Sequence, residues 1–182
     1  MNDFTCVSLS PIWLAGNAGP ESIAIAAARA GGIGLLDAEF CPADAAPTAA
    51  ATLRRLIAAA PAPGTQPGAI GLRLDWAQRH THGLLLETLT GYPHHLILCG
   101  WHAVTDAAAD AAHLAELAAP DRSIWLEIGA VGATNGVQLS ASFDFAGWVA
   151  RGSECGGRCG QESAFILCQH LARQDRPFWV CG

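Results

Sequence analysis

A glycine-rich segment near the end of the chain has the composition of an anion-binding turn. Residues 151–160 read RGSECGGRCG and stand between an apolar, strand-like run and a helix-like run. Glycine lets the backbone approach a bound group closely, and the N-terminus of a following helix offers free N–H groups and the positive end of its dipole. The segment predicts a phosphate site. A glycine turn that only makes a tight corner has the same composition, so this alternative stays open.

Charged residues at the ends of predicted strands are further candidates for a site. Asp37 ends one strand and Glu127 ends another, while Arg73 and Asp75 end a third. A buried carboxylate needs a cationic partner, and Arg73 is the obvious partner for Glu127 or for Asp37. Two interpretations remain. The charges are either a network of ion pairs that stabilises the fold, or a set of charges that tunes the electronic properties of a bound cofactor.

The cysteines and histidines carry weaker signals. The seven cysteines include no C-x-x-C pair, so they are interpreted as small buried residues in a reducing compartment rather than as a disulfide framework. Cys155 and Cys159 flank the glycine turn and are interpreted as packing residues, with redox activity as the alternative. The spacing of the histidines matches no metalloenzyme signature, and no metal site is predicted.

Short apolar runs alternate with Ala-rich segments, a pattern typical of strand–helix–strand units in a parallel sheet. Seven strands are predicted, at Pro11–Ala15, Ile33–Asp37, Ala69–Asp75, His95–Gly100, Ser123–Ile128, Phe145–Ala150 and Pro177–Cys181. Helices are predicted at 20–29, 43–60, 77–90, 103–118 and 161–173, with only a short helix or turn between 129 and 144. This order fits either an open doubly wound sheet or a closed eightfold barrel.

The composition limits the function classes. Ten basic residues, all of them Arg, stand against sixteen acidic residues and give a net charge of −6. This balance argues against a nucleic-acid surface, and the absence of Lys excludes a lysine Schiff base and a lysine-dependent phosphate loop. No apolar run reaches the roughly 18 residues of a membrane span, and no basic leader precedes the first apolar stretch. The expected location is the cytosol, and no membrane partner is expected.

Three motifs resemble one known family. They read PIWLAGNAG at 11–19, AIAAARAGGIG at 24–34 and GSECGG at 152–157. They are similar to motifs of the nitronate monooxygenase-like flavoproteins, and most of all to the barrel at the N-terminus of some bacterial polyketide synthases. The resemblance implies an α/β fold of the parallel TIM-barrel type that binds FMN. Such a barrel ordinarily needs about 250 residues, so residues 1–182 are expected to be one incomplete domain of a longer chain, ending in the loop after the seventh strand.

The resemblance also implies the site residues. The FMN-binding candidates are Ala15, Gly16 and Asn17 against the flavin ring, Arg73 at its electron-rich edge, and Gly156, Gly157, Gly160 and Gly182 around the phosphate. The catalytic candidates are Glu127 and Arg158. Nitronate-oxidising members carry a histidine base where this chain has Arg158, and an Arg that stays protonated cannot act as that base.

Three functions follow from the resemblance. The first is an FMN-dependent, enoyl-reductase-like oxidoreductase that acts on acyl chains bound to an acyl carrier protein in polyketide or fatty acid synthesis. The second is a noncatalytic barrel that docks neighbouring synthase domains, and nitronate oxidation is the third. A homodimer that covers the open barrel edges is a further expectation.

Overall fold

The structure is a computed structural model that describes residues 19–29, 32–59, 70–100, 113–114, 116–134, 144–155 and 159–181. Contacts between residues divide the chain into two units, residues 1–96 and 97–182. Six strands occur in the described ranges, hydrogen-bonded in the order in which they follow one another along the chain. The third of them, β3 (His94–Cys99), contains the boundary between the units.

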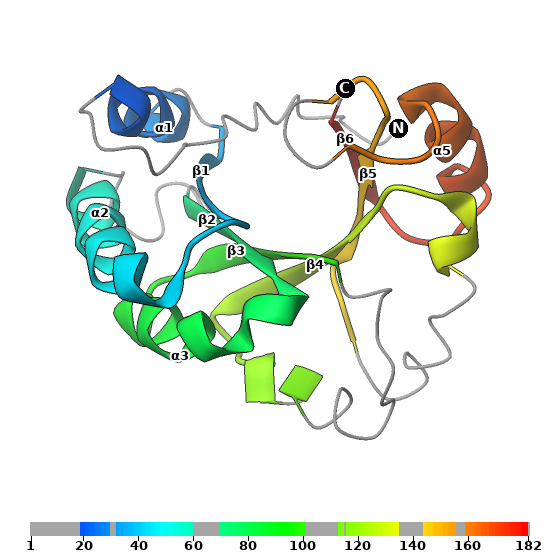
Figure 1. The fold of residues 1–182 in the computed structure, drawn as a ribbon. Coiled ribbons are helices and arrows are strands. Elements are labelled where there is room, and N and C mark those ends of the chain that lie inside the picture. Colours follow the sequence, from blue (N-terminus) through cyan, green and yellow to red (C-terminus); the bar gives the residue numbers. More distant parts are fainter. Residues whose placement is uncertain are drawn as a thin grey trace. The chain divides into compact units, whose positions relative to one another are not determined.

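Unit 1 combines three α-helices with a parallel pair of strands (Figure 1). Its elements are α1 (Gly19–Arg29), β1 (Gly34–Ala38), η1 (Ala43–Ala45), α2 (Ala46–Ala59), β2 (Ile70–Asp75), η2 (Trp76–Gln78) and α3 (Arg79–Thr88). Every position of β2 is buried, as expected of a parallel strand that is covered on both faces. Helix α2 contacts α1, α3 and β1, so the helices pack beside one another and against the strand pair.

Small residues let α1 approach β1 closely. Ala24 and Ala28 on α1 are fully buried, and a Cβ atom at Gly34 would lie 2.4 Å from the carbonyl oxygen of Ala24. Arg29, the last residue of α1, donates from Nε to the carbonyl oxygen of Ala59 at 3.2 Å. A cation at the C-terminal end of α2 interacts favourably with that helix dipole.

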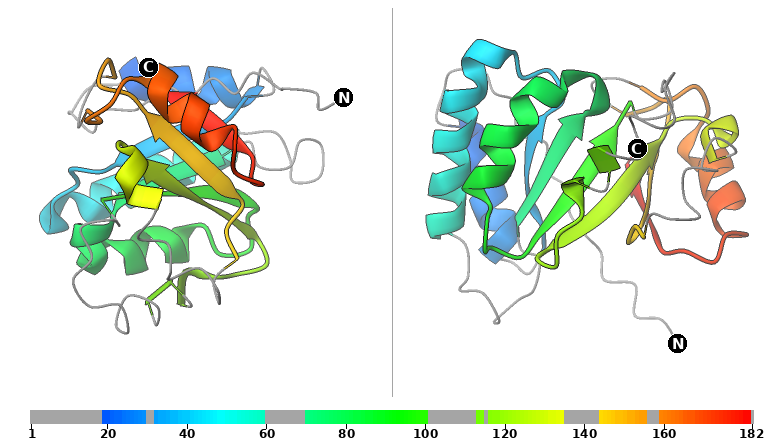
Figure 2. Two further views of the ribbon diagram at one scale, coloured as in Figure 1. Left: turned by 90° about the vertical axis from the view of Figure 1, so that its right-hand side faces the viewer. Right: turned by 90° about the horizontal axis from the view of Figure 1, so that it is seen from below.

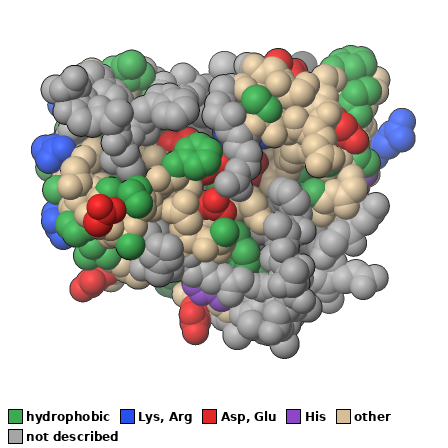
Figure 3. Space-filling model, viewed as in Figure 1, with side chains coloured by type: hydrophobic (Ala, Val, Ile, Leu, Met, Phe, Trp, Pro, Cys, Tyr) green, Lys and Arg blue, Asp and Glu red, His purple; other side chains and the backbone are tan. Residues whose placement is uncertain are grey.

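Unit 2 contains three parallel strands and a covering helix. The strands are β4 (Arg122–Ile128), β5 (Gly147–Arg151) and β6 (Phe178–Cys181), with β5 paired to both neighbours. Helix α5 (Ala164–Leu171) packs against β5 and β6, and both views of Figure 2 show it beside β5. Apolar side chains gather over α5 on the face drawn in Figure 3, and Phe165 is the most exposed of them.

Gly147 lets two tryptophan rings stack on one face of unit 2. The register pairs Trp125 with Gly147, and a Cβ atom at Gly147 would lie only 2.7 Å from the Trp125 ring. The rings of Trp125 and Trp179 instead stack, with centroids 3.6 Å apart and planes inclined by 23°. Because side chains alternate along a strand, Glu127 leaves β4 on the same face as this stack.

The predicted α/β class with parallel strands is confirmed, and the described residues contain six strands rather than seven. The predicted strand at Pro11–Ala15 lies outside the described residues, and so does most of the predicted helix at 103–118. Closure into a barrel stays a prediction. None of the described helices combines the length and the apolar composition that a bilayer crossing requires.

Candidate functional site

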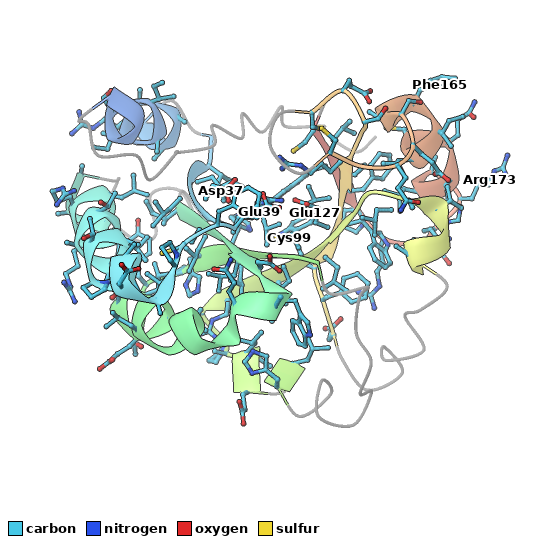
Figure 4. The ribbon with its side chains drawn as sticks, in the orientation of Figure 1. Asp37, Glu39, Cys99, Glu127, Phe165 and Arg173 are labelled. Atoms are coloured by element: carbon cyan, nitrogen blue, oxygen red, sulfur yellow. The ribbon has the colours of Figure 1, made fainter. Side chains whose placement is uncertain are left out.

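An ion cluster formed by Arg73, Asp37 and Glu39, the Arg73 cluster, lies at the carboxyl end of the β1–β2 pair in unit 1. Arg73 Nη1 donates to Asp37 Oδ2 at 3.0 Å, to Asp37 Oδ1 at 3.1 Å and to Glu39 Oε2. The exposed fractions of the side chains are 2% for Arg73, 1% for Glu39 and 16% for Asp37. Figure 4 shows Asp37 and Glu39 together at the end of β1. The cluster therefore buries two carboxylates against one guanidinium.

Strand register and the two-residue alternation of β-strands bring the Arg73 cluster together. Asp37 is paired with Arg73 across β1 and β2, so both side chains leave the sheet on one face. Glu39 stands two residues after Asp37, and its N–H donates to Asp37 Oδ1 at 3.0 Å. Asp75 is also buried, and its Oδ1 accepts the N–H of Ala77 at 3.0 Å. The pairing of Arg73 with Asp37 confirms one of the two partners that the sequence indicates.

In unit 2, the buried carboxylate of Glu127 has Arg151 as an ionic partner. Arg151 Nη1 lies 3.7 Å from Glu127 Oε2, and the two side chains are 11% and 8% exposed. The register pairs Glu127 with Val149, so Arg151, two residues further along β5, stands on the same face. The sequence points instead to Arg73 as the partner of Glu127. That pairing would join the two units, and it stays a prediction.

The described part of the glycine-rich segment is a turn held by backbone hydrogen bonds. The N–H of Gly152 donates to the carbonyl oxygen of Cys181 at 3.1 Å. The N–H groups of Cys155 and Gly160 both donate to the carbonyl oxygen of Gly152, each at 3.2 Å. The N–H of Gly160, predicted to face a phosphate, is therefore already bonded within the turn.

Gly160 also packs against the backbone of two neighbouring segments. A Cβ atom at this position would lie 2.0 Å from the carbonyl oxygen of Arg151 and 2.8 Å from that of Gly129. Only glycine permits so close an approach between backbones. The helix predicted at 161–173, directly after Gly160, begins only at Ala164 as α5. The described contacts give Gly160 a packing role.

Side chains of the chain itself cap the N-terminus of α5. Glu154 Oε1 accepts the N–H of Ala164 at 2.9 Å, and Ser163 Oγ accepts the N–H of Ile166 at 3.4 Å. Hydrogen bonds from the backbone N–H groups of Glu154 and Ala164 lower the pKa of the Glu154 carboxyl. A carboxylate thus occupies the place where the helix dipole favours an anion, and it explains why the helix begins later than the sequence predicts.

We expect the Glu154 cap to make folding stability depend on pH in the acid range. A carboxyl with a lowered pKa stabilises the fold above its ordinary pKa of 4.5 and loses this contribution as the pH falls through the folded-state value. Urea unfolding between about pH 3 and pH 7 should therefore show a steeper loss of stability on acidification for the wild type than for Glu154→Gln. Glu87→Gln, at an exposed position of α3, is the matched control and should keep the wild-type slope. Equal slopes for the wild type and Glu154→Gln would contradict the cap.

The described histidine and cysteine side chains form no metal site. No group of three His, Cys, Asp or Glu side chains in the described ranges is arranged to hold a metal ion. His94 is buried, and its Nδ1 donates to the carbonyl oxygen of Tyr92 at 2.7 Å, which is a packing role. Cys41 and Cys99 are buried as predicted, whereas Cys159 is exposed.

Three of the predicted site residues are described, and the structure gives each a partner within its own unit. Arg73 belongs to the Arg73 cluster, Glu127 pairs with Arg151, and Gly160 packs against backbone. The other candidates lie outside the described residues: Ala15, Gly16, Asn17, Gly156, Gly157, Arg158 and Gly182.

Sequence reasoning missed the roles of Glu39, Arg151 and Glu154. Two of them have a signal in the sequence. Glu39 stands two residues after Asp37, which indicates a shared face, and Arg151 directly follows a predicted strand. Glu154 has no such local signal, because it stands ten positions before the N–H of Ala164 that it accepts.

In comparisons with known proteins, no protein-family model, no curated protein and no solved structure matches the chain. The resemblance of its three motifs to the nitronate monooxygenase-like flavoproteins therefore stays a prediction. The described residues establish an α/β chain with parallel strand pairs, whose buried charges stand at the carboxyl ends of β1, β2, β4 and β5.

Proposed function

We propose that the chain is an FMN-dependent, oxidoreductase-like module that acts on acyl chains held by a carrier protein. The position of its buried charges carries this proposal. The Arg73 cluster in unit 1 and the Glu127–Arg151 pair in unit 2 both stand at the carboxyl ends of parallel strands. Ligand sites of parallel α/β proteins form at this end of the strands.

Bound FMN would supply hydride-transfer chemistry, and the side chains of this chain would orient it. Asp37 and Glu39 hold Arg73 Nη1 from two sides, so the guanidinium is a fixed, permanent cation. A fixed cation suits the electron-rich edge of a flavin ring because it needs no reorganisation when charge develops there. In unit 2, the ion pair between Glu127 and Arg151 holds one further carboxylate and one further guanidinium in place.

The described residues fit FMN only in part. Arg73 offers a cation for the ring, although its side chain is 2% exposed and already paired with Asp37 and Glu39. The N–H of Gly160 is bonded to the carbonyl oxygen of Gly152, and the N–H of Ala164 is bonded to the carboxylate of Glu154. We therefore assign no phosphate contact to Gly160 or to the N-terminus of α5. In this proposal the phosphate-binding candidates are Gly156, Gly157 and Gly182, outside the described residues.

A noncatalytic barrel that docks neighbouring synthase domains is the second candidate, and the Glu154 cap favours it. A carboxylate that caps α5 occupies the place of the anion that a phosphate site would bind there. In that case the buried ion pairs stabilise the fold, and FMN is not bound. Nitronate oxidation is the third candidate, and Arg158 at the position of the histidine base opposes it. The carrier protein and the homodimer remain proposed partners.

Titration of FMN with the 182-residue chain tests the proposal. We expect a change in flavin fluorescence on binding, and we expect Gly156→Trp to weaken binding at least about tenfold, because the indole would fill the phosphate position. Gly83→Trp is the matched control, since a Cβ atom at exposed Gly83 meets no atom within 4 Å. Circular dichroism checks that both variants fold. No response to FMN, or wild-type binding by Gly156→Trp, would favour the docking module.

The substrate class needs a second measurement on the same FMN-loaded chain. After chemical reduction without oxygen, an α,β-unsaturated acyl thioester is expected to restore the absorbance of oxidised flavin. The saturated thioester should not do so. Reduction of the oxidised, loaded chain by a small nitronate would instead support the third candidate.

A further inference from the structure

Thiols gather where β5 and β6 end in unit 2. Cys155 Sγ donates to the carbonyl oxygen of Cys181, which also accepts the N–H of Gly152 at 3.1 Å. Cys159 Sγ donates to the carbonyl oxygen of Cys155 at 2.8 Å. All three cysteines are in the thiol form with no disulfide bond, and none of them is fully buried. The turn after β5 therefore holds the sulfur of Cys155 directly against the backbone of Cys181.

Strand register places the Cys181 side chain on the same face of the sheet as Arg151, while Cys155 lies in the turn after β5. Arg151 is paired with Cys181 across β5 and β6, so their side chains leave the sheet on one face. Glu127, which contacts Arg151, stands on that face too. The thiol of Cys155 reaches the end of β6 through its hydrogen bond to the carbonyl oxygen of Cys181.

We propose that Cys155 and Cys181 are a redox-active thiol pair, which a hydroperoxide converts into a disulfide between the turn after β5 and the end of β6. The thiolate of one cysteine attacks the peroxide O–O bond and becomes a sulfenic acid, with release of water or an alcohol. The second thiol attacks this sulfur, forms the S–S bond and releases a second molecule of water. Two thiols lose two electrons and two protons, and the peroxide is reduced by the same two electrons.

The geometry selects Cys181 over the other thiols as the partner of Cys155. A disulfide needs Cα atoms about 4.4–6.8 Å apart and side chains that face one another. The Cys155 sulfur already contacts the Cys181 carbonyl oxygen, so the two cysteines are neighbours, and formation of the bond requires their side chains to rotate toward one another. Cys159 is exposed, and its sulfur contacts the carbonyl oxygen of Cys155 rather than the Cys155 sulfur, while Cys168 lies on α5 and not in the turn or on β6.

The reaction is expected to be slow at neutral pH and faster in base. Burial raises the pKa of the Cys155 thiol, and the charge of Arg151 opposes that shift only in part. The charged groups that face this thiol are Arg151 on β5, Glu127 on β4 and Glu154 in the turn. Because the thiolate is the nucleophile, the oxidation rate should rise by up to about tenfold per pH unit below the thiol pKa.

Peptide mapping of the native chain after treatment with hydrogen peroxide tests the pair directly. Trypsin separates the relevant thiols by cleavage after Arg158 and Arg173, while the Arg176–Pro177 bond resists cleavage. Cys155 falls in the peptide Gly152–Arg158, Cys181 falls in Gln174–Gly182, and Cys159 and Cys168 share the peptide between them. After free thiols are blocked, the main linked species should join Gly152–Arg158 to Gln174–Gly182 and should disappear on reduction. The proposal would be overturned if the main disulfide joined Gly152–Arg158 to the peptide that carries Cys159 and Cys168. Oxidation of single thiols without any disulfide would also overturn it.

Three serine variants and an unfolded control complete the experiment. Cys155→Ser and Cys181→Ser should each abolish the link, whereas Cys159→Ser should keep it. If a variant fails to fold, peptide mapping of the wild type in urea still tests the proposal. In the urea-unfolded chain, the fold no longer selects a disulfide partner for Cys155. The same preference for Cys181 in urea as in the native chain would overturn the proposal. The oxidised native chain should also unfold at a higher urea concentration than the reduced chain, because the bond closes a segment between residues 26 positions apart.

Discussion

Replacement of Arg73 by Met is expected to lower the free energy of unfolding by about 3–5 kcal/mol. The guanidinium is the cation that Asp37 and Glu39 share, and the Glu39 side chain is only 1% exposed. Met has a similar length but no charge, so the variant leaves two carboxylates with no guanidinium between them. Desolvation of an uncompensated carboxylate is far more costly than the loss of a surface ion pair. Urea unfolding followed by circular dichroism measures the difference.

Two further variants separate the loss of stability in Arg73→Met from the general effect of removing an Arg side chain. Arg54→Met removes an exposed Arg from α2 and should change the free energy of unfolding by less than about 0.5 kcal/mol. Addition of Asp37→Asn and Glu39→Gln to Arg73→Met should restore much of the lost stability, because the carboxylates that lack a cation are then neutral. A loss of less than about 1 kcal/mol in Arg73→Met would show that the cluster does not stabilise the fold as described.

Replacement of Gly160 by Ala is expected to destabilise the chain by about 3 kcal/mol. The added Cβ atom would lie 2.0 Å from the carbonyl oxygen of Arg151 and 2.8 Å from that of Gly129. Both obstacles are backbone atoms, so no side-chain rotation relieves the overlap. One of the segments must shift, and the hydrogen bond from Gln161 N–H to Gly129, now 2.7 Å long, is then strained.

Gly132→Ala is the matched control for Gly160→Ala in unit 2. A Cβ atom at Gly132 meets no atom within 4 Å, and Gly132 does not have a positive φ. Its replacement should therefore leave stability within about 0.5 kcal/mol of the wild type. If Gly160→Ala kept wild-type stability but bound FMN more weakly, Gly160 would contact the phosphate, and its packing role would be wrong.

The helices and strands were predictable because their signals are local. The strand β2 (Ile70–Asp75) reads IGLRLD, an almost continuous apolar run of the kind found in buried parallel strands, and it was predicted to within one residue. The helix α1 (Gly19–Arg29) ends at Arg29, where the sequence places its end. In contrast, α5 begins at Ala164 because Ser163 and Glu154 cap it, and Glu154 lies ten positions away from the N–H that it accepts. A window of neighbouring residues does not contain that contact.

Within the described residues, the amino-acid sequence by itself determined which segments form strands and helices, and that Asp37, Arg73 and Glu127 stand at the carboxyl ends of strands. Both follow from local propensity and from the two-residue period of a strand. Only the tertiary structure decided the partners: Arg151 for Glu127, Glu39 as the second carboxylate on Arg73, and backbone rather than phosphate against Gly160. The reason is physical. Ion pairs and close backbone approaches join residues far apart in the chain, and strand register, which sets those distances to a fraction of an ångström, is a property of the assembled sheet.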